Sequence, residues 1–220
     1  MTQAMKICGL STPQSVDAAL RGGATHLGFI FFAKSPRNVS PDQAAPLAAR
    51  SKSAKTVAVS VNADDEFLEH IVTAMKPDML QLHGSETPQR IDELKARYGL
   101  PIIKAVSIRA AADLEKLPAY AQCADMLLLD AKPPAGSDLP GGNGVSFDWS
   151  LIDDLHGQVP ILLSGGIDFS NIEEAIALVR DPSNGITGLD LSSGVESAPG
   201  VKDIAKIDKI LAAVRAVPAT

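Results

Sequence analysis

The chain has 220 residues, of which 45% are hydrophobic and 21% charged, and it carries a formal net charge of −6. This length and balance are typical of one soluble globular domain, because α/β barrels often run to about 200–250 residues undivided. The negative charge argues against nucleic-acid and anionic-membrane partners, which need an excess of Lys and Arg, so an anionic ligand would require a local site.

Eight apolar runs rich in Val, Ile, Leu and Phe follow one another along the chain, each ended by polar or turn-forming residues. They predict buried β-strands over residues 5–10, 25–31, 55–61, 79–84, 101–108, 125–131, 160–166 and 186–194. The residues before the first run, "MTQA" at 1–4, are expected to form a loose extension.

The segments between these runs have the period of amphipathic helices. "SP" at 40–41 and "TP" at 87–88 place a capping residue before a proline, which predicts a helix start. Pro46 and Pro118 interrupt the second and fifth segments and predict weaker helices there. The apolar faces of the last two helices are formed by Ile172, Ala175, Ile176, Val179, Ile204, Ile207, Leu211 and Val214.

Strands that alternate with helices pair in parallel, and strands as apolar as these are covered on both faces. We therefore predict the α/β class and a single (β/α)8 TIM barrel over residues 1–220, with an open doubly wound sheet as the alternative. The long irregular segment at residues 132–145 predicts a lid or a binding loop.

Polar residues recur at the ends of the predicted strands, where such barrels carry their chemistry. Cys8, His83, Asp130 and Asp190 lie at strand ends, and Arg37 follows the second strand. Cys8 and Asp130, if both point inward, approach the mouth from roughly opposite sides. One could then remove a proton from a small substrate while the other donates one.

Each of these residues also has a purely structural interpretation. A cysteine at a strand end is often a small buried hydrophobe, and an aspartate there is often a helix cap. His83 could be a core histidine, and Arg37 a solvated loop residue. Cys123 falls in a segment predicted to lie at the surface, where we expect no function.

Glycine-rich turns follow the last two strands: "SGG" at 164–166 and "SSG" at 192–194. Each alone is also an ordinary tight turn, but in many barrels these two loops together bind a phosphate. Glycines allow close approach of the backbone, and free N–H groups with a helix dipole favour an anion. Gly165, Gly166, Ser193 and Gly194 are therefore candidate contacts of a phosphorylated small molecule.

A set of motifs in order from Lys6 to Asp203 resembles the phosphoribosylanthranilate isomerase family: "KICGL", "SPRNVS", "QLHGSE", "LLLDA", "GGNGVSFDW", "LSGGI", "LDLSSGVES" and "PGVKD". The resemblance implies a single barrel without cofactor or metal, which serves tryptophan biosynthesis. It implies rearrangement of N-(5-phosphoribosyl)anthranilate into 1-(2-carboxyphenylamino)-1-deoxyribulose 5-phosphate. This sequence departs from the family pattern at Ser11, Asn143 and Ser164, which bear on loop packing more than on activity.

On the matching motifs, the resemblance implies that Cys8 is the general base and Asp130 the general acid, and it assigns Arg37 to the anthranilate carboxylate. A carboxylic acid can protonate the furanose ring oxygen, and a partly ionised thiol can then remove the sugar C2 proton. Lys6, on the same strand face as Cys8, or the cationic iminium intermediate could supply the positive charge that a thiolate needs. His83 and Asp190 are further candidate substrate contacts.

Other functions stay open at this stage. A carbon–carbon lyase on the same phosphate-binding barrel is the main alternative, with Lys104 in the fifth strand as a possible Schiff-base residue. A catalytically silent binding barrel is another. The histidine-pathway aminoaldose isomerase shares the fold and reaction type that the resemblance implies, but it is disfavoured, because its members use an aspartate where Cys8 stands.

Two cysteines make neither a disulfide framework nor a CxxC metal pair, so we expect a reduced protein. The first residues include no apolar stretch of signal-peptide length, and we expect a cytoplasmic location. The expected oligomeric state is a monomer or a homodimer.

Overall fold

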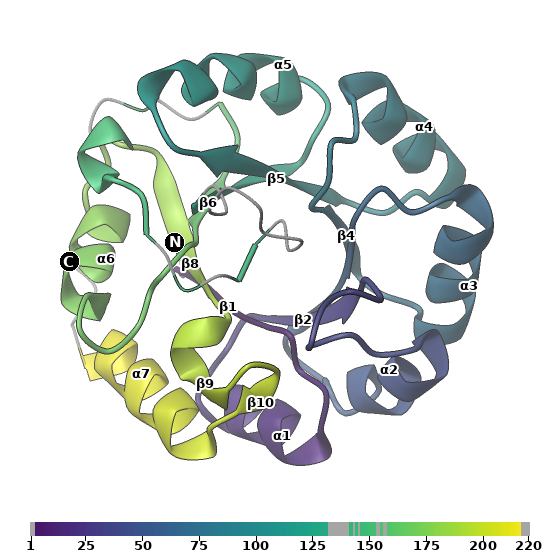
Figure 1. Ribbon diagram of the computed structural model, residues 1–220, viewed down its shortest axis with the longest axis horizontal. Coiled ribbons are helices and arrows are strands. Elements are labelled where there is room, and N and C mark those ends of the chain that lie inside the picture. The colour runs from purple at the N-terminus through teal and green to yellow at the C-terminus, as the bar shows by residue number, and fades with distance from the viewer. Residues whose placement is uncertain are drawn as a thin grey trace.

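The computed structural model describes residues 3–131, 141–142, 144, 146–152, 155 and 158–216. It is a closed barrel of parallel strands, paired in the order β1 to β8 and ringed by helices (Figure 1). The predicted TIM barrel is therefore confirmed, and the open sheet is wrong. Most of the predicted lid at residues 132–145 lies outside the described residues.

The barrel strands are short and follow the predicted apolar runs. Ring closure depends on pairing of the first strand with the last, which sets Lys6 beside Asp190. The strands are β1 Ala4–Cys8, β2 His26–Phe31, β3 Lys55–Ser60, β4 Met79–Leu82, β5 Ile102–Ile108, β6 Met126–Ala131, β7 Ile161–Leu163 and β8 Ile186–Leu191.

Helices pack around the outside of this ring. The α-helices are α1 Pro13–Arg21, α2 Pro41–Ala48, α3 Asp65–Met75, α4 Pro88–Tyr98, α5 Leu117–Ala121, α6 Ile172–Arg180 and α7 Ile204–Ala216. Short 3-10 helices are η1 Ala111–Lys116, η2 Trp149–Ile152 and η3 Ser193–Val195, and a hairpin joins β9 Glu196–Ala198 to β10 Val201–Lys202. Between β6 and β7 the described residues contain η2 and no α-helix.

The predicted helix starts are confirmed, because the Ser40 and Thr87 hydroxyls accept backbone N–H bonds at the first turns of α2 and α4. Pro46 lies inside α2 without ending it. The fifth helix is short, as its proline predicts, and follows η1 directly. In the described part of the chain every helix is too short or too polar to cross a bilayer.

Two predictions, one about the N-terminal segment and one about Cys123, are wrong. Ala4 is the first residue of β1 and pairs with Gly188 of β8, so strand pairing begins inside the segment expected to be a loose extension. Cys123 is buried rather than at the surface, because the turn after α5 packs it into the core, where its thiol donates to the Tyr120 carbonyl.

Side-chain alternation divides the core into two parts. The larger part lies between the strands and the helices. The smaller part fills the barrel interior and consists of Cys8, Val57, Val59, Met79, Ile103, Ala105, Leu128 and Leu162. Because residues two apart share a face, the polar residues Lys6, Gln81 and Asp130 also point into the barrel.

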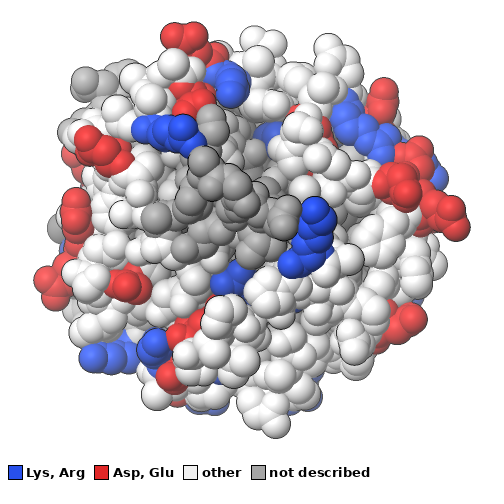
Figure 2. Space-filling view, in the orientation of Figure 1, with Lys and Arg blue, Asp and Glu red and all other residues white. Residues whose placement is uncertain are grey.

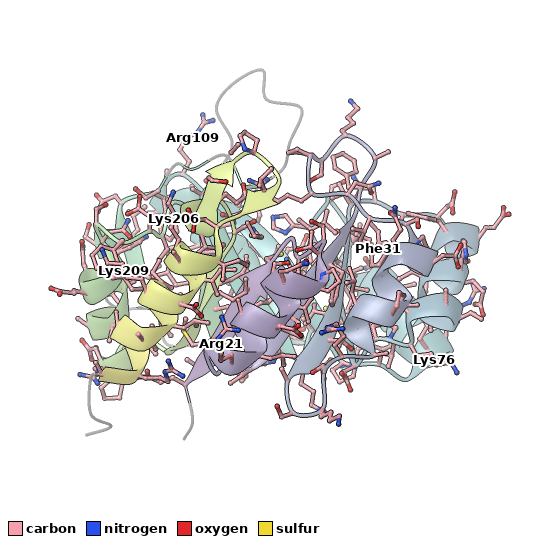
Figure 3. All side chains as sticks on the ribbon, turned by 90° about the horizontal axis from the view of Figure 1, so that it is seen from below. Arg21, Phe31, Lys76, Arg109, Lys206 and Lys209 are labelled. Carbon is pink, nitrogen blue, oxygen red and sulfur yellow. The ribbon has the colours of Figure 1, made fainter. Side chains whose placement is uncertain are left out.

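The carboxyl and amino ends of the strands lie at opposite ends of the barrel. Arg109, which follows β5, and Lys76, which follows α3, lie at opposite ends of the molecule (Figure 3). On the face seen down the barrel, acidic and basic side chains are both scattered around the rim (Figure 2). This mixture fits the argument from net charge against a nucleic-acid surface.

Candidate active site

A pocket opens at the carboxyl ends of the strands, with about 660 Å³ of empty space that includes space open to solvent. Its lining includes every predicted site residue except Gly194: Cys8, Arg37, His83, Asp130, Gly165, Gly166, Asp190 and Ser193. The fold thus gathers side chains that are far apart in the sequence at one mouth.

Cys8 ends β1, lines this pocket and is buried. It faces Gly28 of β2, where a Cβ atom would lie 2.9 Å from the Cys8 Sγ and 3.1 Å from the Lys6 Nζ. The glycine therefore makes room for both side chains. Burial raises the pKa of the Cys8 thiol, and the Lys6 charge offsets that rise only in part. The neutral thiol is the favoured form at neutral pH.

Lys6 is fully buried and pairs with Asp190 of β8, with 2.9 Å between the Nζ and Oδ1 atoms. Burial opposes its charge, but Asp190 and Cys8 together raise the pKa of the Lys6 amine. The Ser164 hydroxyl approaches the other Asp190 oxygen at 3.4 Å. Because the ammonium is already paired, it stabilises a thiolate at Cys8 less than a free ammonium would.

Asp130 lies near the end of β6, with its side chain on the pocket wall. Its Oδ1 atom accepts the backbone N–H of Ala131 at 2.9 Å, and its Oδ2 atom lies 3.2 Å from the Nε2 atom of His83. A backbone N–H therefore donates to a buried carboxyl group, and the imidazole of His83 lies within hydrogen-bond distance of it. Such a group suits proton transfer, because the N–H stabilises the carboxylate that forms when the proton leaves.

His83 follows β4 and bridges two polar side chains. Its Nδ1 atom lies 2.9 Å from the Nε2 atom of Gln81, a residue that the sequence did not identify as part of the site. A polar residue in the middle of the apolar run "MLQLHG" was the available signal. His83 also lines the pocket, with 13% of its side chain exposed.

Arg37 is buried rather than solvated, and its partner is Glu196 at the start of β9. The Nε and Nη2 atoms donate to the two Glu196 oxygens at 2.7 and 2.8 Å. Lys202 of β10 donates to the same carboxylate at 2.7 Å. Burial alone would raise the pKa of Glu196, but Arg37 and Lys202 outweigh it and hold that pKa below its ordinary value.

This arrangement leaves the Nη1 atom of the guanidinium for a ligand, because the Nη2 atom also donates to the Gly142 carbonyl at 3.2 Å. An arginine has five N–H donors in a rigid plane, and Glu196 takes the edge formed by the Nε and Nη2 atoms. Nη1 would be the atom that meets a carboxylate in the pocket. Glu196 and Lys202 fall inside the motifs "SSGVES" and "PGVKD", yet the sequence alone gave no reason to pair them with Arg37.

The glycine turns after β7 and β8 touch each other at the mouth. Gly165 and Gly166 have φ angles of +89° and +63°, in the left-handed region that favours glycine. A Cβ atom on Gly194 would lie 2.0 Å from the Ile167 carbonyl oxygen, so the two loops approach through backbone contact. Gly194 thus supports the pocket wall rather than lining it, and η3 begins beside it at Ser193.

Lys104 points away from the pocket, into the layer between strands and helices. Its neighbours Ile103 and Ala105 fill the barrel interior, so alternation turns the lysine outward. Its Nζ atom donates to Glu86 at 2.9 Å and to the Gly84 carbonyl at 2.7 Å. This placement argues against a Schiff-base lysine and hence against the lyase alternative. Among the described residues, no group of three or more His, Cys, Asp or Glu side chains is placed to hold a metal ion.

Comparison with known proteins agrees with this geometry. The sequence profile of the family described as N-(5'phosphoribosyl)anthranilate (PRA) isomerase matches residues 5–213. The N-(5'-phosphoribosyl)anthranilate isomerase of Rhizobium meliloti (strain 1021) is 55% identical over 216 residues, which cover 98% of each chain. The enzyme of the same name from Mesorhizobium japonicum is 58% identical over 214 residues, covering 96% of this chain and 95% of the relative.

Solved structures give the same result. Phosphoribosyl anthranilate isomerase from Thermotoga maritima is 29% identical with a TM-score of 0.85, over 98% of this chain and 100% of that one. A phosphoribosyl anthranilate isomerase solved with reduced 1-(o-carboxyphenylamino)-1-deoxyribulose 5-phosphate is 29% identical with a TM-score of 0.81, covering 98% and 100% of the two chains. The chain belongs to the N-(5'-phosphoribosyl)anthranilate isomerase family.

Proposed function

We propose that this chain converts N-(5'-phosphoribosyl)anthranilate into 1-(2-carboxyphenylamino)-1-deoxyribulose 5-phosphate, an aldose-to-ketose step of tryptophan biosynthesis, with Cys8 as base and Asp130 as acid. The observation that carries the proposal is that a thiol on β1 and a carboxyl group on β6, three strands apart around the ring, line one pocket. The family and the bound product analogue of a relative support the substrate class.

Asp130 acts first in this proposal. It gives its proton to the furanose ring oxygen, the bond between that oxygen and C1 breaks, and the nitrogen lone pair forms an iminium at C1. The backbone N–H of Ala131 and the imidazole of His83 then stabilise the new carboxylate.

Cys8 acts second, on a cation. The iminium acidifies the C2–H bond and favours loss of the Cys8 thiol proton to water at the pocket mouth. The resulting thiolate takes the C2 proton, and the electron pair of the C2–H bond neutralises the nitrogen to give an enolamine. Tautomerisation to the ketone completes the reaction. Because burial raises the pKa of the thiol and the Lys6 charge is paired with Asp190, the iminium is the better source of the charge that a thiolate needs.

The remaining contacts position the substrate at its two ends. The Nη1 atom of Arg37 suits the anthranilate carboxylate, since a guanidinium and a carboxylate form charge-assisted hydrogen bonds. The turns at Gly165, Gly166 and Ser193 suit the phosphate, because they bring backbone close to the pocket at the mouth. Both ends would be fixed while C1 and C2 lie between Asp130 and Cys8.

Turnover of the two variants Cys8→Ala and Asp130→Asn tests these roles. Each is expected to lower kcat by about 10²–10⁴-fold, as typical for loss of one proton-transfer group. The loss of anthranilate-sugar fluorescence measures turnover, and circular dichroism checks folding. Cys123→Ala is the matched control, since this second buried thiol lies outside the pocket and should keep full kcat. A Cys8→Ala enzyme with wild-type kcat would end the assignment of the base.

We further infer a cytoplasmic location and a monomer or a homodimer. The location rests on the two cysteines, which are both free. A Thermotoga maritima relative is described as dimeric, which makes the homodimer the first state to test. Sedimentation at several protein concentrations distinguishes the two states.

A further inference from the structure

Gln81 is a buried polar residue that packing does not explain. It is the third residue of β4, fully buried, and its register neighbours are Val59 of β3 and Ile103 of β5, both interior residues. Its Oε1 atom has no hydrogen-bond partner among the described residues. A buried amide oxygen without a partner costs stability, whereas leucine or methionine would fit this apolar layer without that cost.

The other end of the same amide does have a partner. The Gln81 Nε2 atom lies 2.9 Å from the His83 Nδ1 atom, and the His83 Nε2 atom lies 3.2 Å from the Asp130 Oδ2 atom. Gln81 therefore touches the pocket acid through a single imidazole. Gly141 packs over that contact, because a Cβ atom there would lie 2.4 Å from the Asp130 oxygen and 2.7 Å from the His83 nitrogen.

The chemistry of a neutral imidazole links these contacts. One ring nitrogen carries a proton and donates, and the other accepts. An amide N–H directed at Nδ1 makes that atom the acceptor, so the proton lies on Nε2 and is donated to Asp130. Without this contact the proton could lie on Nδ1, and Nε2 would then accept the acidic proton of Asp130 and hold it back from a substrate.

We propose that Gln81 is a positioning residue for the acid: its amide fixes the tautomer of His83, which then stabilises the Asp130 carboxylate as the proton leaves. This inference rests on the proposed function, because it deepens the role given to Asp130. The Oε1 atom without a partner lowers stability, and this cost is the consequence of keeping the Gln81 amide N–H beside His83.

Gln81→Leu tests the proposal, with Met79→Leu as its matched control. Met79 lies on the same strand and the same inward face, two residues from Gln81. Gln81→Leu is expected to lower kcat about tenfold or more. This loss is smaller than the about 10²–10⁴-fold loss expected when the acid itself is removed. KM should stay within twofold of wild type. The urea midpoint of unfolding should stay equal or rise, and Met79→Leu should leave kcat unchanged.

Combining Gln81→Leu with Asp130→Asn separates positioning from a general structural role. If Gln81 acts through the acid, the double variant turns over as slowly as Asp130→Asn alone, measured in single turnovers with excess enzyme. A multiplied loss, a lowered urea midpoint, or a Gln81→Leu kcat within twofold of wild type would each overturn the proposal.

The tautomer can also be observed directly. Nitrogen-15 NMR of labelled histidine, with His83→Gln identifying the signal, should show a protonated Nε2 and an unprotonated Nδ1 in the wild type, and a change in Gln81→Leu. A wild-type Nδ1–H signal overturns the proposal. Failure of the wild-type enzyme to consume the anthranilate sugar is a different result: it refutes the proposed function, while the tautomer is still measured.

Discussion

Replacing Glu196 by glutamine tests how the pocket holds its arginine. The carboxylate receives two bonds from Arg37, at 2.7 and 2.8 Å, and one from Lys202 at 2.7 Å. The exposed fractions of the Arg37 and Glu196 side chains are both 4%, so water screens this cluster little. Glu196→Gln keeps the shape but removes the negative charge, leaving two buried cations without compensation.

The size of the effect follows from this burial. Removing one partner of a buried ion pair costs about 3–5 kcal/mol in the free energy of unfolding, because the other charge is left unpaired. For a chain of this size that loss corresponds to a fall in Tm of roughly 6–20 °C. An exposed pair gives a contrasting expectation: Asp208→Asn, which breaks the surface pair with Arg21, should cost less than about 1 kcal/mol.

Urea unfolding at equilibrium measures both variants, with KM for the anthranilate sugar as a second readout of Arg37 placement. The lowered pKa of Glu196 predicts how pH acts: its stabilisation is present above the ordinary glutamate pKa and is lost as pH falls through the lower folded pKa. The gap between wild type and Glu196→Gln should therefore narrow in acid. A loss in Glu196→Gln no larger than that in Asp208→Asn would refute the reasoning.

Two further predictions concern the thiol and the glycine turn. Burial raises the pKa of Cys8, so its thiol should be alkylated at half the maximal rate at a higher pH in the folded chain than in the urea-unfolded chain. The measurement uses a Cys123→Ala chain, in which Cys8 is the remaining thiol. An equal or lower pH midpoint in the folded chain would contradict this prediction. Gly165→Ala should lower both stability and kcat, since its Cβ would lie 2.6 Å from the Ala131 nitrogen that holds Asp130, at a φ angle costing about 1–2 kcal/mol. Unchanged urea midpoint and kcat would count against that role for Gly165.

The barrel was predictable because each strand has a local signal. A strand covered on both faces is apolar throughout, so its run stands out from the amphipathic helices that flank it. The ends of the strands were less predictable. The apolar run at 160–166 contains only the short strand β7 Ile161–Leu163, because the glycines that follow belong to the turn. Composition marks where an apolar strand lies, whereas hydrogen bonding to its neighbours decides where it ends.

The site residues at strand ends were predictable, because a (β/α)8 barrel carries its active site at the carboxyl ends of its strands. The partners of these residues were not predictable. Arg37 and Glu196 are 159 positions apart, and no local pattern links a loop arginine to a glutamate in a distant hairpin. Lys104 looked like a candidate nucleophile because it interrupts an apolar strand. Its side chain lies on the outer face of β5 in the closed barrel, so it points toward Glu86 and away from the pocket.

The burial of Cys8 suggests why a thiol suits this position. A carboxylate placed in the apolar interior would need its own cation or several donors, and Lys6 is already paired with Asp190. A thiol is neutral at neutral pH and costs little to bury. In the proposed mechanism this thiol ionises only when ring opening at Asp130 forms a cation beside it. The order of the two proton transfers would then follow from the surroundings of the two groups, acid before base.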